Sequence, residues 1–276
     1  LGKIATNDWE KARAIYVWVT RNIAYDTESY FSGKKATTNG GGVLKTGKSV
    51  CAGYGNLFHQ LAESLGLESK VVSGYGKGYS FTGVDPGGTN HAWNALFING
   101  KWRLFDSTWG AGNVSGKRFH REYNEHYFNP APNTLIFKHF PEDVDFQLLE
   151  TPVTREEFFR LPNSRLEVFD TGIDPDFIIE RVRAGETLEL PSVWNADRFT
   201  VVEVPFENPL DSSNLYRFVI EAPSSELLIV NESERFDIVK TDGQFRFIDQ
   251  DLRSGRLTFF LKTGENYYSI LRYEVE

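Results

Sequence analysis

Residues 47–58 read GKSVCAGYGNLF, a stretch in which a polar loop with glycine and lysine leads into an apolar-periodic helix. Cys51 stands where this helix is expected to begin, and it is the single cysteine among 276 residues. The unpaired N–H groups and the positive dipole end of a helix N-terminus favour a thiolate. A lone cysteine is more often an inert, buried small hydrophobe. The stretch alone therefore leaves a reactive and a structural cysteine as alternatives.

The helix that starts near Cys51 is expected to end at Gly66, because glycine favours helix C-termini. Gly53 and Gly55 lower its stability, and we expect them to allow close approach of a neighbouring element. An earlier helix is predicted from Asn7, which forms a capping-box pattern with Glu10, to about residue 22. Between the two helices, the polar and glycine-rich residues 26–42 predict a mobile loop.

Two strands are predicted at 91–98 and 101–106, because Asn99-Gly100 between apolar runs is a strong signal for a two-residue hairpin turn. In that register Trp93 lies opposite Asp106. His91 and Asp106 are then diagonal neighbours on one face of the hairpin, within side-chain reach. A three-residue turn would place them on opposite faces. The hairpin thus predicts a histidine–carboxylate pair that depends on its register.

A cysteine at a helix start and a His–Asp pair on a strand are the groups that a thiol nucleophile needs. His91 would take or share the proton of Cys51, and Asp106 would orient the imidazole. His59 is a poor alternative base, since it lies roughly 12 Å farther along the same helix at 1.5 Å per residue. We therefore predict Cys51, His91 and Asp106 as the catalytic residues.

The other histidines have no comparable pairing argument. Isolated histidines are more often surface or structural residues, and one cysteine with scattered histidines provides no metal-ligand spacing. We expect no metal site and no cofactor. The histidines set aside on this ground are His120, His126 and His139.

Composition limits the class of protein. The content of 40% hydrophobic and 14% aromatic residues is ample for a packed core. Of the net charge of −8, residues 1–150 hold +2 (16 basic against 14 acidic) and residues 151–276 hold −10 (14 against 24). The absence of a clustered basic stripe argues against a nucleic-acid partner, and no apolar run reaches membrane-spanning length. We therefore expect a protein or peptide substrate, and the oligomeric state is left open.

The chain starts Leu1-Gly2-Lys3, without a methionine and without a charged-then-apolar signal pattern. We expect a processed or trimmed product, as secreted and periplasmic proteins are, although the compartment is unknown. A single cysteine excludes an intramolecular disulfide and says nothing about redox environment.

Residues 166–276 have a different sequence pattern, with many short strand candidates separated by turn signals. Such spacing without helical patterns predicts an all-β sandwich. We therefore expect two domains, 1–165 and 166–276. The strand candidates are Thr187–Leu190, Phe199–Val204, Leu215–Glu221, Leu227–Val230, Arg235–Lys240, Gln244–Ile248, Arg256–Lys262 and Tyr267–Val275.

Five motifs in order resemble the transglutaminase-like superfamily, whose core shares the papain-like thiol fold. They read CAGY from residue 51, GY from 74, HAWN from 91, GKW from 100 and DSTW from 106. The segments AIYVWVT from 14 and NIAYD from 22 are similar to the kyphoscoliosis-peptidase and cytokinesis-protein branch. The likeness covers roughly residues 8–165. It implies an α+β core with the cysteine on a helix N-terminus and the histidine and aspartate on an antiparallel sheet, followed by β-rich accessory segments.

The resemblance implies the triad Cys51, His91 and Asp106 and acyl transfer on amide bonds through a thioester. Water as acceptor makes such a protein a peptidase or amidase, and a lysine amine makes it a cross-linker. The alternative is a non-catalytic scaffold with a vestigial triad. Well-studied transglutaminases use an aromatic residue upstream of the cysteine in the oxyanion hole, but residues 32–50 contain none. The aromatics that either line a substrate cleft or belong to the core are Tyr54, Tyr75, Tyr79, Trp93 and Trp109.

Overall fold

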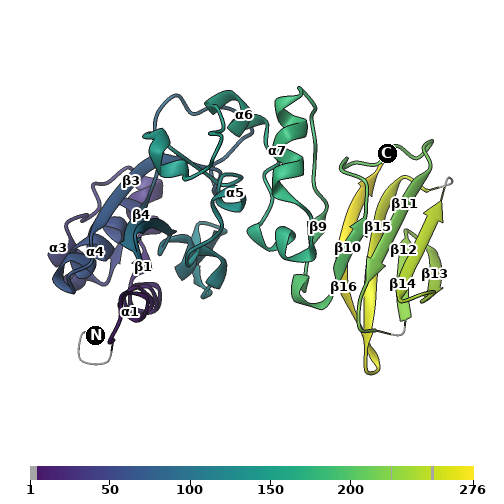
Figure 1. Ribbon diagram of the computed structural model, residues 1–276, viewed down its shortest axis with the longest axis horizontal. Helices are drawn as coiled ribbons and strands as arrows, with labels where there is room; N and C mark the ends of the chain where they lie inside the picture. Colours follow the sequence, from purple (N-terminus) through teal and green to yellow (C-terminus); the bar gives the residue numbers. More distant parts are fainter. Residues whose placement is uncertain (1–4, 225, 250–251) are drawn as a thin grey trace. The chain divides into compact units, whose positions relative to one another are not determined.

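The computed structural model describes residues 5–224, 226–249 and 252–276 (Figure 1). The chain divides into two compact units, an N-terminal unit (Leu1–Thr154) and a C-terminal unit (Arg155–Glu276). The predicted boundary at 165/166 falls inside the C-terminal unit, because the helix α6 (Arg155–Arg160) packs on the later helix α7 (Pro175–Arg183).

The N-terminal unit contains the predicted first helix, α1 (Asp8–Asn22). The Asn7 side chain accepts the Glu10 N–H at 3.0 Å, as the capping pattern predicts. The Glu10 carboxylate accepts the backbone N–H of Thr6, one residue before the cap, rather than that of Asn7. The predicted helix start is confirmed. The return bond of the capping box, from a backbone N–H to the Glu10 carboxylate, comes from the residue before the expected one.

The helix α4 (Cys51–Ser64) lies on a four-stranded sheet of order β5-β4-β3-β8 (Figure 1). A Cβ on Gly55 would come within 3.2 Å of Val71 Cγ1, so glycine permits the close helix–sheet approach that the sequence predicts. Asn94 on β4 is fully buried, and its amide donates to the Gly55 carbonyl at 2.9 Å. The helix start is thereby held against β4. The strands are β3 (Ser69–Gly76), β4 (His91–Ile98), β5 (Lys101–Phe105) and β8 (His139–Pro141).

The predicted hairpin between β4 and β5 has the predicted register. Ile98 pairs with Lys101 and Asn94 pairs with Phe105, which requires a two-residue turn. Asn99 and Gly100 have φ angles of 51° and 76°, as a type I′ turn requires at both central positions. The local turn chemistry thus determines which face the later residues occupy.

The predicted loop at residues 26–42 is confirmed for residues 33–39 and wrong on either side of them. The structure contains the short helices α2 (Thr27–Ser32) and α3 (Gly40–Thr46). Asp26 and Asn39 cap them by accepting backbone N–H groups three residues on. The polar composition that indicates a loop therefore supplies helix caps. The strand β1 (Ala24–Tyr25), before α2, pairs in parallel with β2 (Lys48–Ser49), after α3.

Short elements complete the N-terminal unit beyond β5. They are η1 (Trp109–Ala111), β6 (Gly112–Ser115), β7 (Arg118–Arg121), η2 (Glu125–Tyr127), α5 (Pro132–Leu135) and η3 (Val144–Gln147). Of these, β6 and β7 form an antiparallel hairpin.

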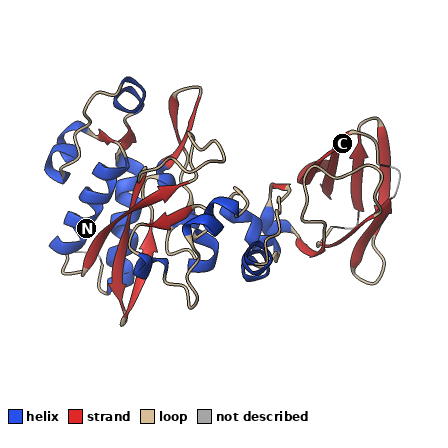
Figure 2. Cartoon of the chain, turned by 90° about the horizontal axis from the view of Figure 1, so that it is seen from above, coloured by secondary structure: helices blue, strands red, loops and turns tan. Residues whose placement is uncertain are grey.

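The C-terminal unit contains a three-stranded sheet of order β10-β11-β14 and a five-stranded sheet of order β13-β12-β15-β16-β9 (Figure 2). Rings from the two sheets meet, since Phe218 on β11 lies 4.9 Å from Phe259 on β15 and 5.5 Å from Tyr273 on β16. The expected sandwich is confirmed. Its strands are β9 (Ser192–Val193), β10 (Thr200–Glu203), β11 (Tyr216–Glu221), β12 (Glu226–Asn231), β13 (Glu234–Val239), β14 (Gln244–Asp249), β15 (Gly255–Thr263) and β16 (Asn266–Val275).

Two features of this unit differ from the prediction. Thr187–Leu190 is not a strand; β9 pairs with β16 in its place. The unit also contains α7 and the 3-10 helices η4 (Leu166–Thr171) and η5 (Ala196–Arg198). Asp174 caps α7 and Pro175 opens it, a start signal present in the sequence but outweighed there by the strand pattern.

None of the described helices combines the length and apolar character needed to cross a bilayer.

Candidate active site

Cys51 opens α4 and is half-buried. Burial raises the pKa of this thiol. The hydrogen bond with His91 and the charge of that imidazole, together with the backbone N–H of Ala92, outweigh the burial, so the pKa lies below its usual value. A lowered pKa gives the thiolate, which is the nucleophilic form of cysteine. The packing of α4 on β4 therefore brings the predicted cysteine to the predicted histidine.

His91 and Asp106 lie on one face of the hairpin, as its register predicts. The imidazole Nε2 lies 2.7 Å from Asp106 Oδ2, and both side chains are buried. Asp106 Oδ1 accepts the backbone N–H groups of Thr108 at 2.7 Å and Trp109 at 3.1 Å. Both oxygens of the carboxylate are thus held, and the imidazole has a fixed orientation.

The electrostatics of this pair favour a charged imidazole. Burial lowers the pKa of His91, but the charge of Asp106 and the hydrogen bonds to Asp106 and Cys51 outweigh it and raise the pKa to about 10. Burial raises the pKa of Asp106, but the charge of His91 and the hydrogen bonds from His139 and His91 hold it well below its usual value. Asp106 is therefore ionised, and the His91 imidazole carries a proton at neutral pH.

His139 is the residue of this site that sequence reasoning missed. It is fully buried, and its Nε2 lies 2.8 Å from the same Asp106 Oδ2 that His91 contacts. It reaches the carboxylate because β8 pairs with β3, with His139 opposite Gly76. The sequence around His139 does not predict that it lies beside Asp106, because the pairing of β3 with β8 joins segments distant in the chain.

The three buried side chains have the geometry of hydrogen bonds rather than of metal coordination. His91, Asp106 and His139 place ligand-type atoms within 4.8 Å of one another. Two imidazole nitrogens at 2.7 and 2.8 Å from one carboxylate oxygen are donors to that oxygen. Ligands of a tetrahedral zinc ion with bonds of about 2.0 Å stand roughly 3.3 Å apart. We therefore assign no metal to this cluster.

Aromatic rings enclose the His91 imidazole. The Trp109 ring stacks on it at 4.7 Å between centroids, and the Trp93 ring stacks at 5.9 Å. A Cβ on Gly76 would lie 2.9 Å from His91 Cβ and 3.1 Å from Cγ, so glycine leaves room for the imidazole. The sequence identifies five aromatic residues that either line a substrate cleft or belong to the core. Of these, Tyr54, Tyr75 and Trp93 are buried and Tyr79 is exposed.

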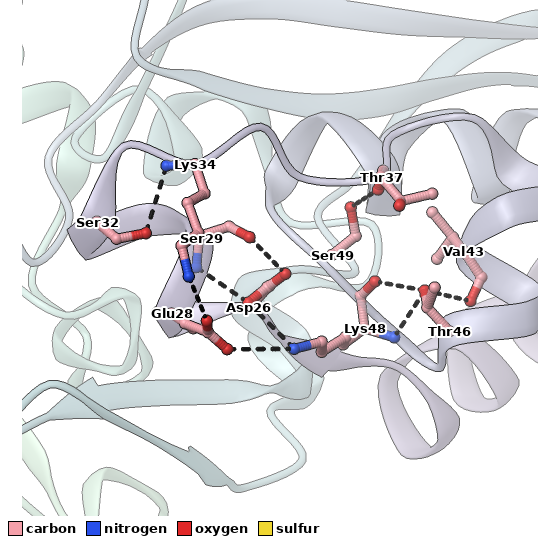
Figure 3. Close-up of polar contacts among 10 residues, drawn as sticks. All are labelled: Asp26, Glu28, Ser29, Ser32, Lys34, Thr37, Val43, Thr46, Lys48 and Ser49. Carbon is pink, nitrogen blue, oxygen red and sulfur yellow. Dashed lines mark hydrogen bonds and ion pairs between the residues drawn. The ribbon is translucent and has the colours of Figure 1, made fainter.

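The segment before Cys51 is held by the polar contacts drawn in Figure 3. The Lys48 ammonium lies 3.6 Å from Asp26 and 3.9 Å from Glu28. The Ser49 hydroxyl donates to the Thr37 carbonyl at 2.5 Å. In addition, the backbone N–H of Asp26 donates to the Ser49 carbonyl at 2.8 Å. These contacts join α2 to the strand that leads directly into Cys51.

A pH-dependent loss of stability is expected from His139. Burial lowers its pKa to about 4, although its hydrogen bond with Asp106 acts in the opposite direction. Between pH 6.5 and pH 4 the unfolded chain binds a proton that the native state does not, so stability falls as the pH is lowered. His139→Gln keeps an amide donor for Asp106 and removes the titration. Between pH 6.5 and pH 4, the free energy of unfolding of the wild type should therefore fall by about 3 kcal/mol more than that of this variant.

Urea unfolding at pH 6.5 and pH 4, followed by tryptophan fluorescence, measures this difference. His120→Gln is the matched control, because His120 is exposed and its replacement should leave the pH dependence unchanged. Equal losses of stability in the wild type and His139→Gln would show that His139 is not held neutral.

Comparison with known proteins shows which proteins this chain is similar to. The family model of the transglutaminase-like superfamily matches residues 2–107, which include Cys51, His91 and Asp106. Mouse kyphoscoliosis peptidase is 35% identical over 173 residues, which cover 61% of this chain and 26% of that protein. Hillarin of Drosophila melanogaster is 30% identical over 187 residues, covering 61% and 22%. Cytokinesis protein 3 of Schizosaccharomyces pombe is 23% identical over 204 residues, covering 72% and 21%.

The matched part thus spans between 21% and 26% of the length of these relatives. The resemblance to the superfamily, and to the branch of kyphoscoliosis peptidase and cytokinesis proteins, is confirmed.

Proposed function

We propose that Cys51, His91 and Asp106 act as a triad for acyl transfer on amide bonds of proteins or peptides. All three lie within residues 2–107, which the family model of the transglutaminase-like superfamily matches. The observation that carries this proposal is the buried His91–Asp106 pair, with Nε2 2.7 Å from Oδ2, beside a Cys51 thiol whose pKa the imidazole lowers. The lowered pKa of Cys51 and the raised pKa of His91 are the pattern that a nucleophile and its acid–base partner require.

In the first half of the proposed reaction, the Cys51 thiolate forms a C–S bond to the amide carbonyl carbon. The N–H of Cys51 lies at the first helical position, where the helix provides no acceptor for it, and it donates to the developing oxyanion. His91 transfers its proton to the departing amine as the C–N bond breaks. The products are a free amine and a thioester on Cys51.

In the second half, the now neutral His91 takes a proton from the acceptor, which attacks the thioester carbonyl. Thiolate departure restores the Cys51–His91 ion pair. Asp106 stays ionised throughout and holds the imidazole, because four donors share its two oxygens. Water as acceptor releases an acid, and an amine as acceptor gives a new amide.

Mass spectrometry of an acid-quenched mixture of the full chain with casein peptides tests the proposal. We expect a hydroxylamine-labile acyl adduct on the peptide that contains Cys51, and none on Cys51→Ala. A glutamine donor adds the peptide mass less one ammonia, whereas peptide-bond cleavage adds a truncated acyl fragment. Added lysine methyl ester should appear in the product only if amines accept the acyl group. Absence of any Cys51 adduct would favour the non-catalytic scaffold.

A further inference from the structure

Three aromatic side chains are exposed together on the N-terminal unit. Tyr30 and Phe31 on α2 are 40% and 37% exposed, and Tyr79, in the loop after β3, is 56% exposed. Their rings touch edge to face, at 5.0 Å between Tyr30 and Phe31 and 5.6 Å between Phe31 and Tyr79. Edge contacts leave ring surface open to another aromatic group.

A fourth ring connects this cluster to the candidate active site. Tyr25 lies 5.8 Å from Tyr30 between centroids. It pairs with Ser49 across β1 and β2, and Ser49 lies two residues before Cys51. Burial raises the pKa of the Tyr25 hydroxyl, and the charge of Cys51 is the next largest cause. Tyr25 therefore joins the three exposed rings to the strand that leads into Cys51; we call the rings of Tyr25, Tyr30, Phe31 and Tyr79 the aromatic ledge.

Contacts between separate segments hold the ledge. The Tyr30 hydroxyl donates to Ser80 Oγ at 2.9 Å, which ties α2 to the loop after β3. The Lys117 ammonium, in the turn between β6 and β7, lies 5.7 Å from the centre of the Phe31 ring. The N-terminus of α2 is fixed by the bonds from Ser29 to Asp26, which Figure 3 shows beside the ion pairs of Lys48. The ledge is thus anchored to the segment that carries Cys51.

We propose that the aromatic ledge binds an aromatic side chain of the peptide substrate, next to the amide presented to Cys51. This inference rests on the proposed function and adds the substrate class. The occupant is a peptide side chain because Tyr25, the inner ring of the ledge, pairs with Ser49 two residues before the thiol that would attack the peptide's amide. It is aromatic because edge and offset ring contacts favour aromatic groups by about two- to tenfold beyond the burial of area.

Alkylation by tripeptide chloromethyl ketones measures this preference without a known substrate. The Cys51 thiolate displaces chloride from the probe and forms a thioether. One phenylalanine is moved through the three positions of an acetyl-triglycyl probe, since an extended residue spans about 3.3–3.6 Å. We expect one phenylalanine probe to react with the full chain about tenfold faster than the all-glycine probe. Phe31→Ser and Tyr79→Ser should remove most of this advantage and leave the iodoacetamide rate unchanged.

Phe97→Ser is the matched control. Phe97 is 38% exposed and lies near the C-terminal end of β4, whereas His91 lies at the N-terminal end of the same strand. This variant should keep the phenylalanine preference. If no phenylalanine probe exceeds the all-glycine probe, or if the advantage survives in both ledge variants, the ledge is not a substrate subsite. If the wild-type thiol also reacts with iodoacetamide no faster than free cysteine, the proposed function fails, and the ledge proposal fails with it.

Discussion

Replacing Asp106 by asparagine is expected to destabilise the protein by about 3–5 kcal/mol, because it breaks a buried charged network by removing one partner. The carboxylate is fully buried and accepts from two imidazoles and two backbone N–H groups. An asparagine offers one acceptor oxygen and turns an NH₂ group toward these donors. At least one donor pair is then left without an acceptor, and His91 loses the charge that stabilises its protonated form.

Urea unfolding of the full chain, followed by tryptophan fluorescence, measures this effect. Five of the six tryptophans lie in the N-terminal unit, so the signal reports mainly the unit that contains Asp106. Asp26→Asn is the matched control: Asp26 is also buried but caps α2, and asparagine is an equally good cap. A loss at Asp106 no larger than the loss at Asp26 would contradict the network described for Asp106.

Replacing His91 by alanine is expected to slow the reaction of Cys51 with iodoacetamide about tenfold at pH 6, with the difference disappearing near pH 9. Without the imidazole, burial of the thiol is uncompensated, and a cysteine with a pKa of about 8.5 or higher is less than roughly 0.3% thiolate at pH 6. The imidazole lowers the pKa of Cys51, so a larger fraction of the thiol is ionised at that pH in the wild type. A thiolate of lower pKa is also a weaker nucleophile, so we expect a gain in rate of only about tenfold.

Intact-mass measurement of alkylation between pH 5 and pH 9.5 determines these rates, and the single cysteine makes the assignment unambiguous. His59→Ala is the control on the same helix; His59 faces Glu63 at 3.5 Å and should not affect the profile. A wild-type thiol that follows the pH dependence of free cysteine would exclude the ion pair and leave the non-catalytic scaffold as the better account.

How much of this site could be predicted from the sequence depends on how local each structural relation is. The pairing of His91 with Asp106 could be predicted because Asn99-Gly100 determines the hairpin register, and the register determines the face. The start of α4 at Cys51 and the strands from β10 to β16 could be predicted for the same reason, since each follows from a short pattern. The caps of α2 and α3 were also local, but their polar and glycine-rich composition resembles that of a loop.

By itself, the sequence determined a cysteine at a helix start, a histidine and a carboxylate on one hairpin face, and a β sandwich in the C-terminal part. These features follow from neighbours within a few residues, where turn geometry and periodicity act without the rest of the chain. Only the tertiary structure decided that α4 packs on β4 so that Cys51 meets His91, and that β8 brings His139 to Asp106. Both depend on which distant segments bury one another, a choice made by packing of the whole unit.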